Sequence, residues 1–219
     1  CYVAAEDVGI TVDDVDVVFS KTRFTTCISP GLGGSGNPSV PTALGVKVAM
    51  DSAVQYHHNC SLEGKVVAVQ GLGNVGGALV GYLLDAGVGR IIGADISQAK
   101  VDACLEKYAE HKDRLNLRVE SSDVPFPESI LSEECDVFSP CGFGGILHEG
   151  SIPHIKAKII CGAANNQLLD SRTDYGMQAN GISYIPDFVC NRMGIVNCAN
   201  EQYGSVGEMG STKDPIISR

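Results

Sequence analysis

The order of apolar and polar residues predicts a strand, a helix and a second strand in the middle of the chain. Val66 to Val69 is an apolar run of the length of a strand that is buried on both faces. Beyond it, apolar residues recur at helical spacing, at Ala78, Leu79, Tyr82 and Leu83. A second apolar run from Arg90 to Ala94 predicts the next strand. This order is typical of a parallel βαβ unit.

The alternation continues on both sides of this unit. A helix is predicted from Pro41 to about Gln55, with a polar break at His57 to Asn59, and a surface helix from Gln98 to Lys112. Residues 1–26 predict only a short helix or turn followed by a strand or loop. Further strands are predicted at Leu115–Val119, Cys135–Ser139, Lys158–Cys161 and Ile182–Ile185. The sequence therefore predicts an α/β protein with a doubly wound parallel sheet.

A glycine-rich turn links the first central strand to its helix, and it has the spacing G-x-G-x-x-G from Gly71 to Gly76. The first glycine permits a tight turn, the second lets a pyrophosphate approach the backbone, and the third lets helix and strand pack closely. The positive end of the helix would hold the phosphates. The residues predicted to bind a dinucleotide here are Gly71, Gly73, Asn74, Val75 and Gly76. The alternative is a purely structural glycine turn.

An acidic residue at the end of the second central strand refines this prediction. Asp95 lies 19 residues after Gly76, where a carboxylate can accept hydrogen bonds from both ribose hydroxyls of an adenosine. A 2′-phosphate would meet a negative charge at this position, so the sequence favours NAD over NADP as the cofactor. The later strands also end in small or polar residues, at Ser139–Gly142, Gly162–Asn166 and Pro186–Asn191. Ligands of such sheets bind at these carboxyl ends.

Length, charge and cysteine usage narrow the class of protein. The 219 residues suffice for one large domain or for one domain plus fragments. The net charge of −10 argues against a nucleic-acid or anionic-membrane partner, and no apolar run approaches the ~20 residues of a membrane helix. No signal peptide is visible, and a first residue other than methionine suggests an incomplete chain.

The cysteines and histidines point to no metal site. The nine cysteines are odd in number and never in C-x-x-C spacing, which predicts neither a disulfide framework nor a zinc site and favours a reducing, cytoplasmic location. The five histidines have no metal-ligand spacing either.

Several ordered motifs together resemble a known family. The resemblance runs from residue 2 to about residue 204, and it rests on AEDVGITVDDVD (5–16), GLGGSGNPS (31–39), SLEGKVVAVQGLGNVG (61–76), CDVFSPC (135–141), GGI (144–146), IPHIKAKII (152–160), NNQL (165–168) and YIPDFVCN (184–191). These motifs are similar to those of the glutamate/leucine/phenylalanine/valine dehydrogenases, and within that family most similar to the leucine dehydrogenase branch.

The resemblance implies an activity and a domain plan. Enzymes of this family interconvert an L-amino acid with its 2-oxo acid and ammonia, using a nicotinamide cofactor. Their first domain carries catalytic lysines upstream of the AEDVG motif, and their C-terminal helices return to that domain. We therefore expect residues 1–30 to be a remnant of the substrate domain, 31–204 to be the NAD-binding domain and 205–219 to begin the return segment. The full-length form is expected to be a homo-oligomer.

Individual roles carry over by resemblance, each beside a simpler alternative. Asp7 matches the family's catalytic aspartate, which moves protons with a lysine, but an aspartate there can also cap the turn that follows it. Thr42 matches the threonine that binds the nicotinamide carboxamide, or it satisfies a helix turn. Asn166 matches an asparagine that reaches substrate and nicotinamide, or it is a turn residue. Pro140 and Cys141 match residues that line the cofactor's ribose through backbone atoms.

The substrate pocket is the part in which this sequence departs from the leucine branch. That branch has N-A-G-G where this chain has Asn191 to Gly194, with the larger Arg192 and Met193 in the middle. The next two pocket positions match Ile195 and Cys198, which are apolar and suit an aliphatic side chain better than a second carboxylate.

These residues favour NAD-dependent oxidative deamination of an apolar, branched-chain L-amino acid, with this chain supplying mainly the cofactor domain and inactive by itself. One alternative is a non-catalytic NAD-binding module or partner-dependent subunit, since the lysine-bearing segment is absent from the sequence. Another is a glutamate dehydrogenase, against which Ile195 and Cys198 argue.

Overall fold

The computed structural model describes residues 2–203, which form parts of two compact units. The sheet unit comprises residues 42–191. The second unit, here called the two-segment unit, combines residues 1–41 with residues that follow 191. The domain boundaries predicted from the sequence, after residues 30 and 204, separate expected functions, and this assignment of domains stays a prediction.

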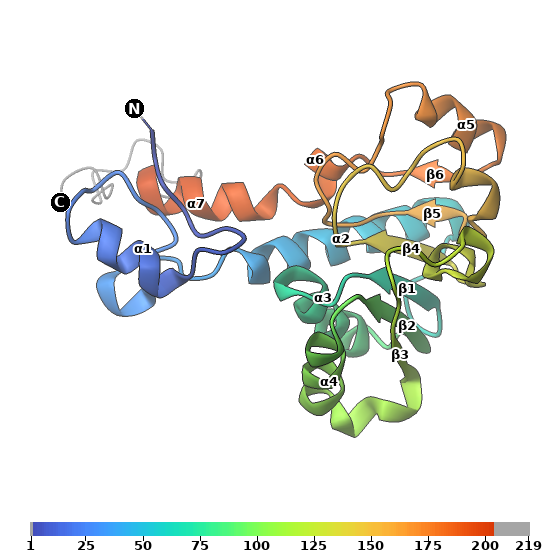
Figure 1. The fold of residues 1–219 in the computed structure, drawn as a ribbon, viewed down its shortest axis with the longest axis horizontal. Helices are drawn as coiled ribbons and strands as arrows, with labels where there is room; N and C mark the ends of the chain where they lie inside the picture. The colour runs from blue at the N-terminus through green and yellow to red at the C-terminus, as the bar shows by residue number, and fades with distance from the viewer. Residues whose placement is uncertain (1, 204–219) are drawn as a thin grey trace. The chain divides into compact units, whose positions relative to one another are not determined.

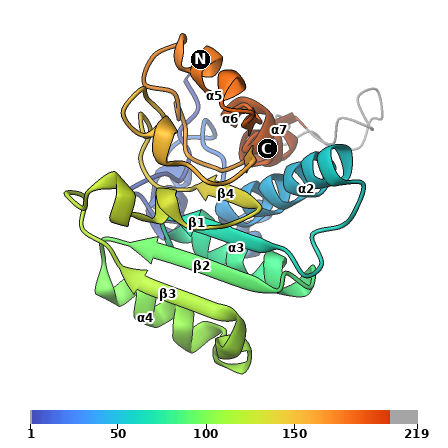
Figure 2. The same cartoon turned by 90° about the vertical axis from the view of Figure 1, so that its right-hand side faces the viewer.

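The sheet unit is built on six parallel strands in the order β3-β2-β1-β4-β5-β6 (Figures 1 and 2). Their bounds are β1 Val66–Gln70, β2 Arg90–Asp95, β3 Leu115–Val119, β4 Val137–Pro140, β5 Ile159–Ile160 and β6 Ser183–Tyr184. The strand order changes direction between β1 and β4, and these two strands pair with each other. This is the doubly wound, Rossmann-type arrangement, and it confirms the predicted fold class.

Helices and short 3-10 turns connect the strands of this unit. The α-helices are α2 Ser39–His58, whose first residues belong to the two-segment unit, α3 Asn74–Asp85, α4 Gln98–Lys107, α5 Thr173–Ala179 and α6 Asp187–Cys190. The 3-10 helices are η2 Ala109–Arg114, η3 Phe126–Glu128, η4 Ile130–Ser132 and η5 Ile152–His154.

Two sequence-based helix ends were wrong. The helix predicted to run to Lys112 ends at Lys107, because Tyr108 leaves helical dihedral angles and its hydroxyl donates to the carbonyl oxygen of Gly77. The polar break predicted at His57 is instead the last turn of α2. Exposed polar side chains do not end a helix by themselves, and α2 ends where Asn59 adopts a left-handed conformation with φ of 51°.

Alternate residues of the strands pack into two separate cores, one on each face of the sheet. On one face, Val67, Val69 and Ile91 pack with buried residues of α2, α3 and α4. On the other, Ala68 and Ile92 pack with residues of η4, η5 and α5. Figure 1 shows α3 and α4 together on one side of β1, β2 and β3. Parallel strands covered on both faces account for the continuous apolar runs in the sequence.

The two-segment unit contains α1 Val12–Phe19, η1 Pro30–Leu32 and α7 Met193–Tyr203. A capping box begins α1: Asp14 N–H donates to Thr11 Oγ1, and Thr11 N–H donates back to the Asp14 carboxylate. In residues 2–203, no helix is long and apolar enough to cross a membrane.

A buried carboxylate ties the two segments of this unit together. Glu201 of α7 is 5% exposed, and its oxygens accept hydrogen bonds from the backbone N–H groups of Cys27 at 2.9 Å and Ser35 at 2.8 Å. The Ile28 N–H at 3.3 Å and the Ser35 hydroxyl also donate to it. A second glycine-rich segment, residues 30–38, is here called the glycine-rich loop. A single side chain thus satisfies the N–H groups of Cys27 and Ile28, which precede this loop, and of Ser35 within it. Backbone donors that are shielded from water need such partners.

Replacing this carboxylate should destabilise the protein. We expect Glu201→Ala to lower the free energy of unfolding by about 3 kcal/mol, because buried N–H groups lose their only strong acceptor. Asn200→Ala, which alters the exposed neighbouring residue of the same helix, is the matched control and should change it by less than about 0.5 kcal/mol. Urea unfolding of both variants measures the difference, and equal midpoints would refute the role given to Glu201.

Candidate functional site

The carboxyl ends of β1 and β4 meet where the strand order reverses, and they bring two sequence motifs into contact. Cys141 N–H donates to the Gln70 carbonyl oxygen at 2.7 Å, which extends the pairing of the two strands by one residue. Gly71 has φ of 88°, and a Cβ there would lie 2.9 Å from the Gly142 nitrogen. Both its conformation and its neighbours therefore require glycine. Ligands of doubly wound sheets bind at this switch point.

The other two glycines of the turn have different surroundings. A Cβ at Gly76 would overlap the carbonyl oxygen of Gly71, so the third glycine is needed for α3 to pack against the turn. A Cβ at Gly73 would come within 4 Å of one described group outside the turn, Lys100 Nζ at 3.7 Å. The space over Gly73 is therefore open except for the mobile end of one side chain. These surroundings match the separate tasks expected of the three glycines.

The beginning of α3 offers hydrogen-bond donors to a ligand. The helix starts at Asn74, and Gly77 N–H donates to the Gly73 carbonyl oxygen at 2.7 Å in its first turn. Within residues 2–203, no side chain caps this end of the helix. The N–H groups of Asn74 and Val75 therefore point out of the helix with the positive end of its dipole, an arrangement that binds anions such as phosphates.

Asp95, at the end of β2, has a structural task in addition to its predicted one. Its side chain is buried at 8% exposure, with Oδ2 accepting from Leu72 N–H at 2.8 Å and Oδ1 from Ser97 N–H at 2.9 Å. The carboxylate thereby ties the glycine turn to the end of β2. Each oxygen keeps a further lone pair, so the carboxylate can still accept from ribose hydroxyls.

A cation stands beside this carboxylate. Lys100 Nζ of α4 lies 3.9 Å from Asp95 Oδ2, and its side chain is exposed. The same ammonium is the group nearest to the open position over Gly73. Lys100 is not among the residues predicted from the sequence to bind the cofactor. Its distance of five residues from Asp95 is the only signal that could have indicated this neighbourhood.

The residues after β4 shape the wall of the switch point. Pro140 is buried, and its carbonyl oxygen accepts from Ala164 N–H at 2.9 Å. The Cys141 thiol lies 3.4 Å from the Ser139 hydroxyl, and burial raises its pKa. A thiol with a raised pKa is a poor nucleophile at neutral pH, which agrees with reading Cys141 as a lining residue. Gln70 Oε1 is buried and has no hydrogen-bond partner among the described residues.

Asn166 follows β5 in a left-handed conformation, with φ of 53°. Its N–H donates to Asp187 Oδ2 at 2.5 Å, which links the end of β5 to the start of α6. Gln167, which is fully buried, donates from Nε2 to the Gly162 and Ala164 carbonyl oxygens at 2.9 Å each. This loop is fixed by its own hydrogen bonds while the Asn166 side chain remains exposed. Thr42, the other predicted nicotinamide contact, is half-buried in α2.

Three predicted site residues belong to the two-segment unit. Asp7 is exposed, and its Oδ1 accepts from Val8 N–H at 2.8 Å in the turn that leads to Ile10, so it has the capping contact of the simpler alternative. Ile195 is 70% exposed on α7. Cys198 is 8% exposed, and its thiol lies 3.2 Å from that of Cys27 within the same unit. Their roles in catalysis and substrate binding stay predictions.

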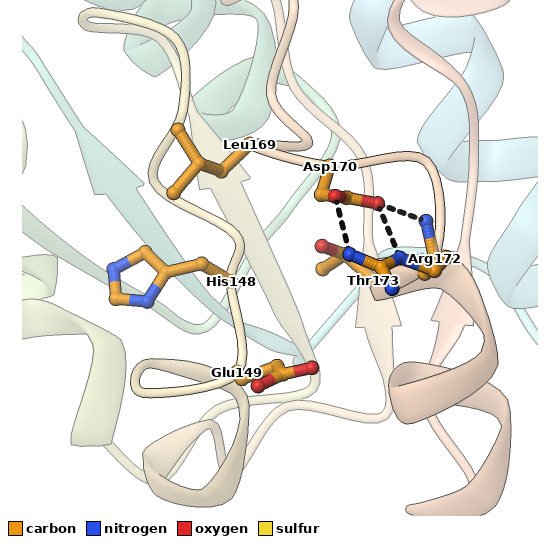
Figure 3. A pocket seen from close by; sticks show the side chains of 6 residues that line it. All are labelled: His148, Glu149, Leu169, Asp170, Arg172 and Thr173. Carbon is orange, nitrogen blue, oxygen red and sulfur yellow. Dashed lines mark hydrogen bonds and ion pairs between the residues drawn. The ribbon is translucent and has the colours of Figure 1, made fainter.

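A separate hollow of about 300 Å³ lies elsewhere on the sheet unit (Figure 3). It is lined by His148, Glu149, Leu169, Asp170, Arg172 and Thr173. Arg172 donates to both carboxylate oxygens of Asp170, at 3.2 and 3.1 Å, so its charge is already paired. None of the lining residues is a predicted site residue. Among residues 2–203, no group of three His, Cys, Asp or Glu side chains could hold a metal ion.

Comparison with known proteins decides the family. The sequence profile of the glutamate/leucine/phenylalanine/valine dehydrogenases matches residues 33–214. The chain belongs to this dehydrogenase family. It is 42% identical over 204 residues to a leucine dehydrogenase from Geobacillus stearothermophilus, which covers 93% of this chain and 52% of that protein. It is 37% identical over 214 residues to a phenylalanine dehydrogenase from Lysinibacillus sphaericus, covering 97% and 54%.

Solved structures agree with the family assignment. The L-tryptophan dehydrogenase of Nostoc punctiforme superposes with a TM-score of 0.70 at 30% identity, over 99% of this chain and 56% of that one. The hetero-hexameric glutamate dehydrogenase of Thermus thermophilus gives a TM-score of 0.68 at 19% identity, over 90% of this chain and 49% of that one, and shows a shared fold. The chain thus spans about half the length of the dehydrogenases it matches.

The different surroundings of two glycines predict different effects on folding. Gly76→Ala should lower the free energy of unfolding by about 3 kcal/mol, because the new methyl group overlaps the backbone of Gly71. Gly73→Ala adds the same methyl group into open space and should cost less than about 1 kcal/mol. Chemical unfolding of both variants measures this, and a larger loss for Gly73→Ala would contradict the geometry of the turn.

Proposed function

We propose that this chain is the NAD-binding part of an amino-acid dehydrogenase that oxidatively deaminates an apolar, branched-chain L-amino acid. The observation that supports it most is the combination, at the switch point, of an uncapped helix end, an open glycine and a buried carboxylate. Membership of the family supports the reaction class. The relatives are named for leucine, phenylalanine and valine, which supports an apolar substrate.

The residues present fit a dinucleotide. A pyrophosphate over Gly73 would meet the N–H groups at the start of α3, and no Cβ stands in its way. The adenosine ribose would reach Asp95, whose geometry is fixed in advance by the N–H groups of Leu72 and Ser97. A carboxylate that is held by two backbone donors is already oriented, so its preference between the two cofactors does not depend on ordering of the side chain when the ligand binds.

The protein's task is to bind and orient, because the nicotinamide supplies the hydride acceptor when the cofactor is bound. In this proposal Thr42 and Asn166 orient the nicotinamide, and the backbone of Pro140 and Cys141 lines the adjoining ribose. Asp7 would hold or move the proton that is exchanged with a lysine. Ile195 and Cys198 would provide apolar surface for the substrate side chain. A homo-oligomeric full-length form and a cytoplasmic location belong to the same proposal. One structural neighbour, the glutamate dehydrogenase of Thermus thermophilus, is a hetero-hexamer, which supports an oligomeric form.

Cofactor preference tests the role of Asp95. NAD should bind at least tenfold more tightly than NADP, a difference of about 1.4 kcal/mol, because a 2′-phosphate would meet the buried carboxylate. Asp95→Asn keeps the side chain's shape and one acceptor but removes its charge. This variant should therefore bind NAD and NADP with more similar affinities. Lys100→Ala, which removes the neighbouring cation, should increase the preference for NAD over NADP. Calorimetric titration of each protein with both cofactors gives the two affinities. Equal affinities in the unmodified protein would exclude Asp95 as the residue that selects NAD.

The 219-residue chain should bind NAD but should not catalyse the deamination of amino acids. The residues proposed to bind NAD all lie in the sheet unit, whereas the lysines expected from the resemblance are not in this sequence. Losing a positioned general base costs on the order of 10²–10⁴ in rate. NAD should therefore raise the melting temperature, while no NADH should form with leucine, valine or phenylalanine. Turnover by this chain would overturn the account of the missing lysines, and the absence of a thermal shift would overturn the cofactor site.

A further inference from the structure

Four of the buried cysteines form two close thiol pairs. Cys198 is proposed above to contact the substrate as apolar surface, but the proposed function gives none of the four thiols a chemical role. In the two-segment unit, Cys27 Sγ lies 3.2 Å from Cys198 Sγ. In the sheet unit, Cys161 Sγ lies 3.4 Å from Cys190 Sγ. All four cysteines are reduced in this structure. The spacing of cysteines along the sequence gives no sign of either pair, because their members are far apart in the chain.

We propose that Cys27 and Cys198 are a site of reversible oxidation, at which a hydroperoxide converts the two thiols into a disulfide. The bond would join the segment before the glycine-rich loop to α7. The sulfur atoms need to approach by about 1.2 Å to reach the ~2.05 Å of a disulfide, a movement within the range of side-chain rotation.

Hydrogen bonds hold the backbone on both sides of this pair. Glu201, one turn after Cys198 on α7, accepts from the N–H of Cys27. The hydroxyl of Thr26, next to Cys27, donates to the carbonyl oxygen of Cys198 at 3.0 Å. Gln202 Nε2 donates to the carbonyl oxygen of Thr25. The two segments are therefore kept in register by three contacts that do not involve sulfur, and the two thiols stay adjacent.

The two thiols are not equivalent. Cys198 is 8% exposed and Cys27 is 0% exposed, so a small oxidant reaches Cys198 more readily. The hydrogen bond between the two thiols lowers the pKa of Cys198, and the same bond together with burial raises the pKa of Cys27. Thiolate is the nucleophilic form of cysteine. Cys198 is therefore the thiol that attacks the oxidant first, and Cys27 is the resolving thiol.

The chemistry balances in two steps. The Cys198 thiolate attacks the terminal oxygen of the peroxide, a sulfur–oxygen bond forms, and the oxygen–oxygen bond breaks with loss of alcohol or water. Cys27 then attacks the sulfenic sulfur, its proton goes to the leaving hydroxide, and a second water leaves. Two thiols have lost two electrons, which the peroxide has taken up. A dithiol reductant reverses the reaction by thiol–disulfide exchange.

The pair in the sheet unit provides an internal comparison. Cys161 and Cys190 are both 0% exposed. Cys161 Sγ lies 3.8 Å from the carbonyl oxygen of Val46, and Cys190 Sγ lies 3.5 Å from that of Ile185. A peroxide in solution has no comparable access to these sulfurs. The hydrogen bond within this pair lowers the pKa of Cys190 and raises that of Cys161, as in the first pair. The sulfur–sulfur distances are also similar, so a difference in reactivity between the two pairs would report on exposure.

The bond would change the two-segment unit in a measurable way. It would close a loop from residue 27 to residue 198, which contains the entire sheet unit. Cross-links that close long loops restrict the unfolded chain most, so the oxidised protein should melt at a higher temperature than the reduced one.

Peptide mapping tests the proposal directly. The 219-residue protein is treated with hydrogen peroxide, its remaining thiols are alkylated in denaturant, and it is digested with trypsin without reductant. The four cysteines fall on four different tryptic peptides, at residues 24–47, 193–213, 159–172 and 173–192. We expect a cross-linked peptide of 24–47 with 193–213 that disappears on treatment with dithiothreitol, while 159–172 and 173–192 are recovered alkylated.

Cysteine variants test whether peroxide acts specifically on the pair of Cys27 and Cys198. Cys27→Ser should abolish the cross-link and leave Cys198 as a sulfenic acid that dimedone traps. Cys198→Ser should abolish both the cross-link and the trapped adduct. Cys161→Ser is the matched control, with the cross-link retained, and peroxide should raise the melting temperature of this variant but not that of either pair variant. Recovery of 24–47 and 193–213 as separate peptides, or preferential linkage of Cys161 to Cys190, would overturn the proposal.

Discussion

The close approach of two backbones at the switch point is the constraint on which the cofactor site depends. Gly71 leaves β1 at a positive φ and lies against the Cys141–Gly142 backbone, which leaves β4. Gly76 in turn packs its backbone onto Gly71. No side chain fits at either position, so α3 begins directly over the strand ends with its N–H groups free for a ligand. Asp95 completes the arrangement, because its carboxylate holds the same turn through Leu72 N–H.

In the two-segment unit, a buried carboxylate holds the two chain segments together. Glu201 satisfies the N–H groups of Cys27 and Ile28 before the glycine-rich loop and of Ser35 within it. The same contact is one of the three hydrogen bonds that keep the backbone around Cys27 in register with α7 near Cys198. Stability of this unit and reactivity of its thiols therefore have a common origin, and a change at Glu201 should affect both.

The glycine turn, Asp95 and the strands around them could be predicted because each has a local pattern: an apolar run, a glycine spacing or a fixed distance to an acid. The family motifs added roles for Asn166 and Asp7, and these roles stay predictions. Lys100 beside Asp95, Asp187 beside Asn166, and Glu201 beside Cys27 could not be predicted, since each contact joins separate elements and depends on the fold. The end of α4 was misplaced for the same reason, because Tyr108 is directed by its bond to Gly77.

Amide chemical shifts during titration with NAD test the central claim most directly. Backbone resonances of the ¹⁵N-labelled 219-residue chain would be followed as the cofactor is added. A dinucleotide held at the switch point should shift the amides from Leu72 to Gly76 most strongly, with smaller changes at Ser97 and Gly142. Shifts confined to the hollow around His148 and Arg172, or no shifts at millimolar NAD, would contradict the assignment of this site.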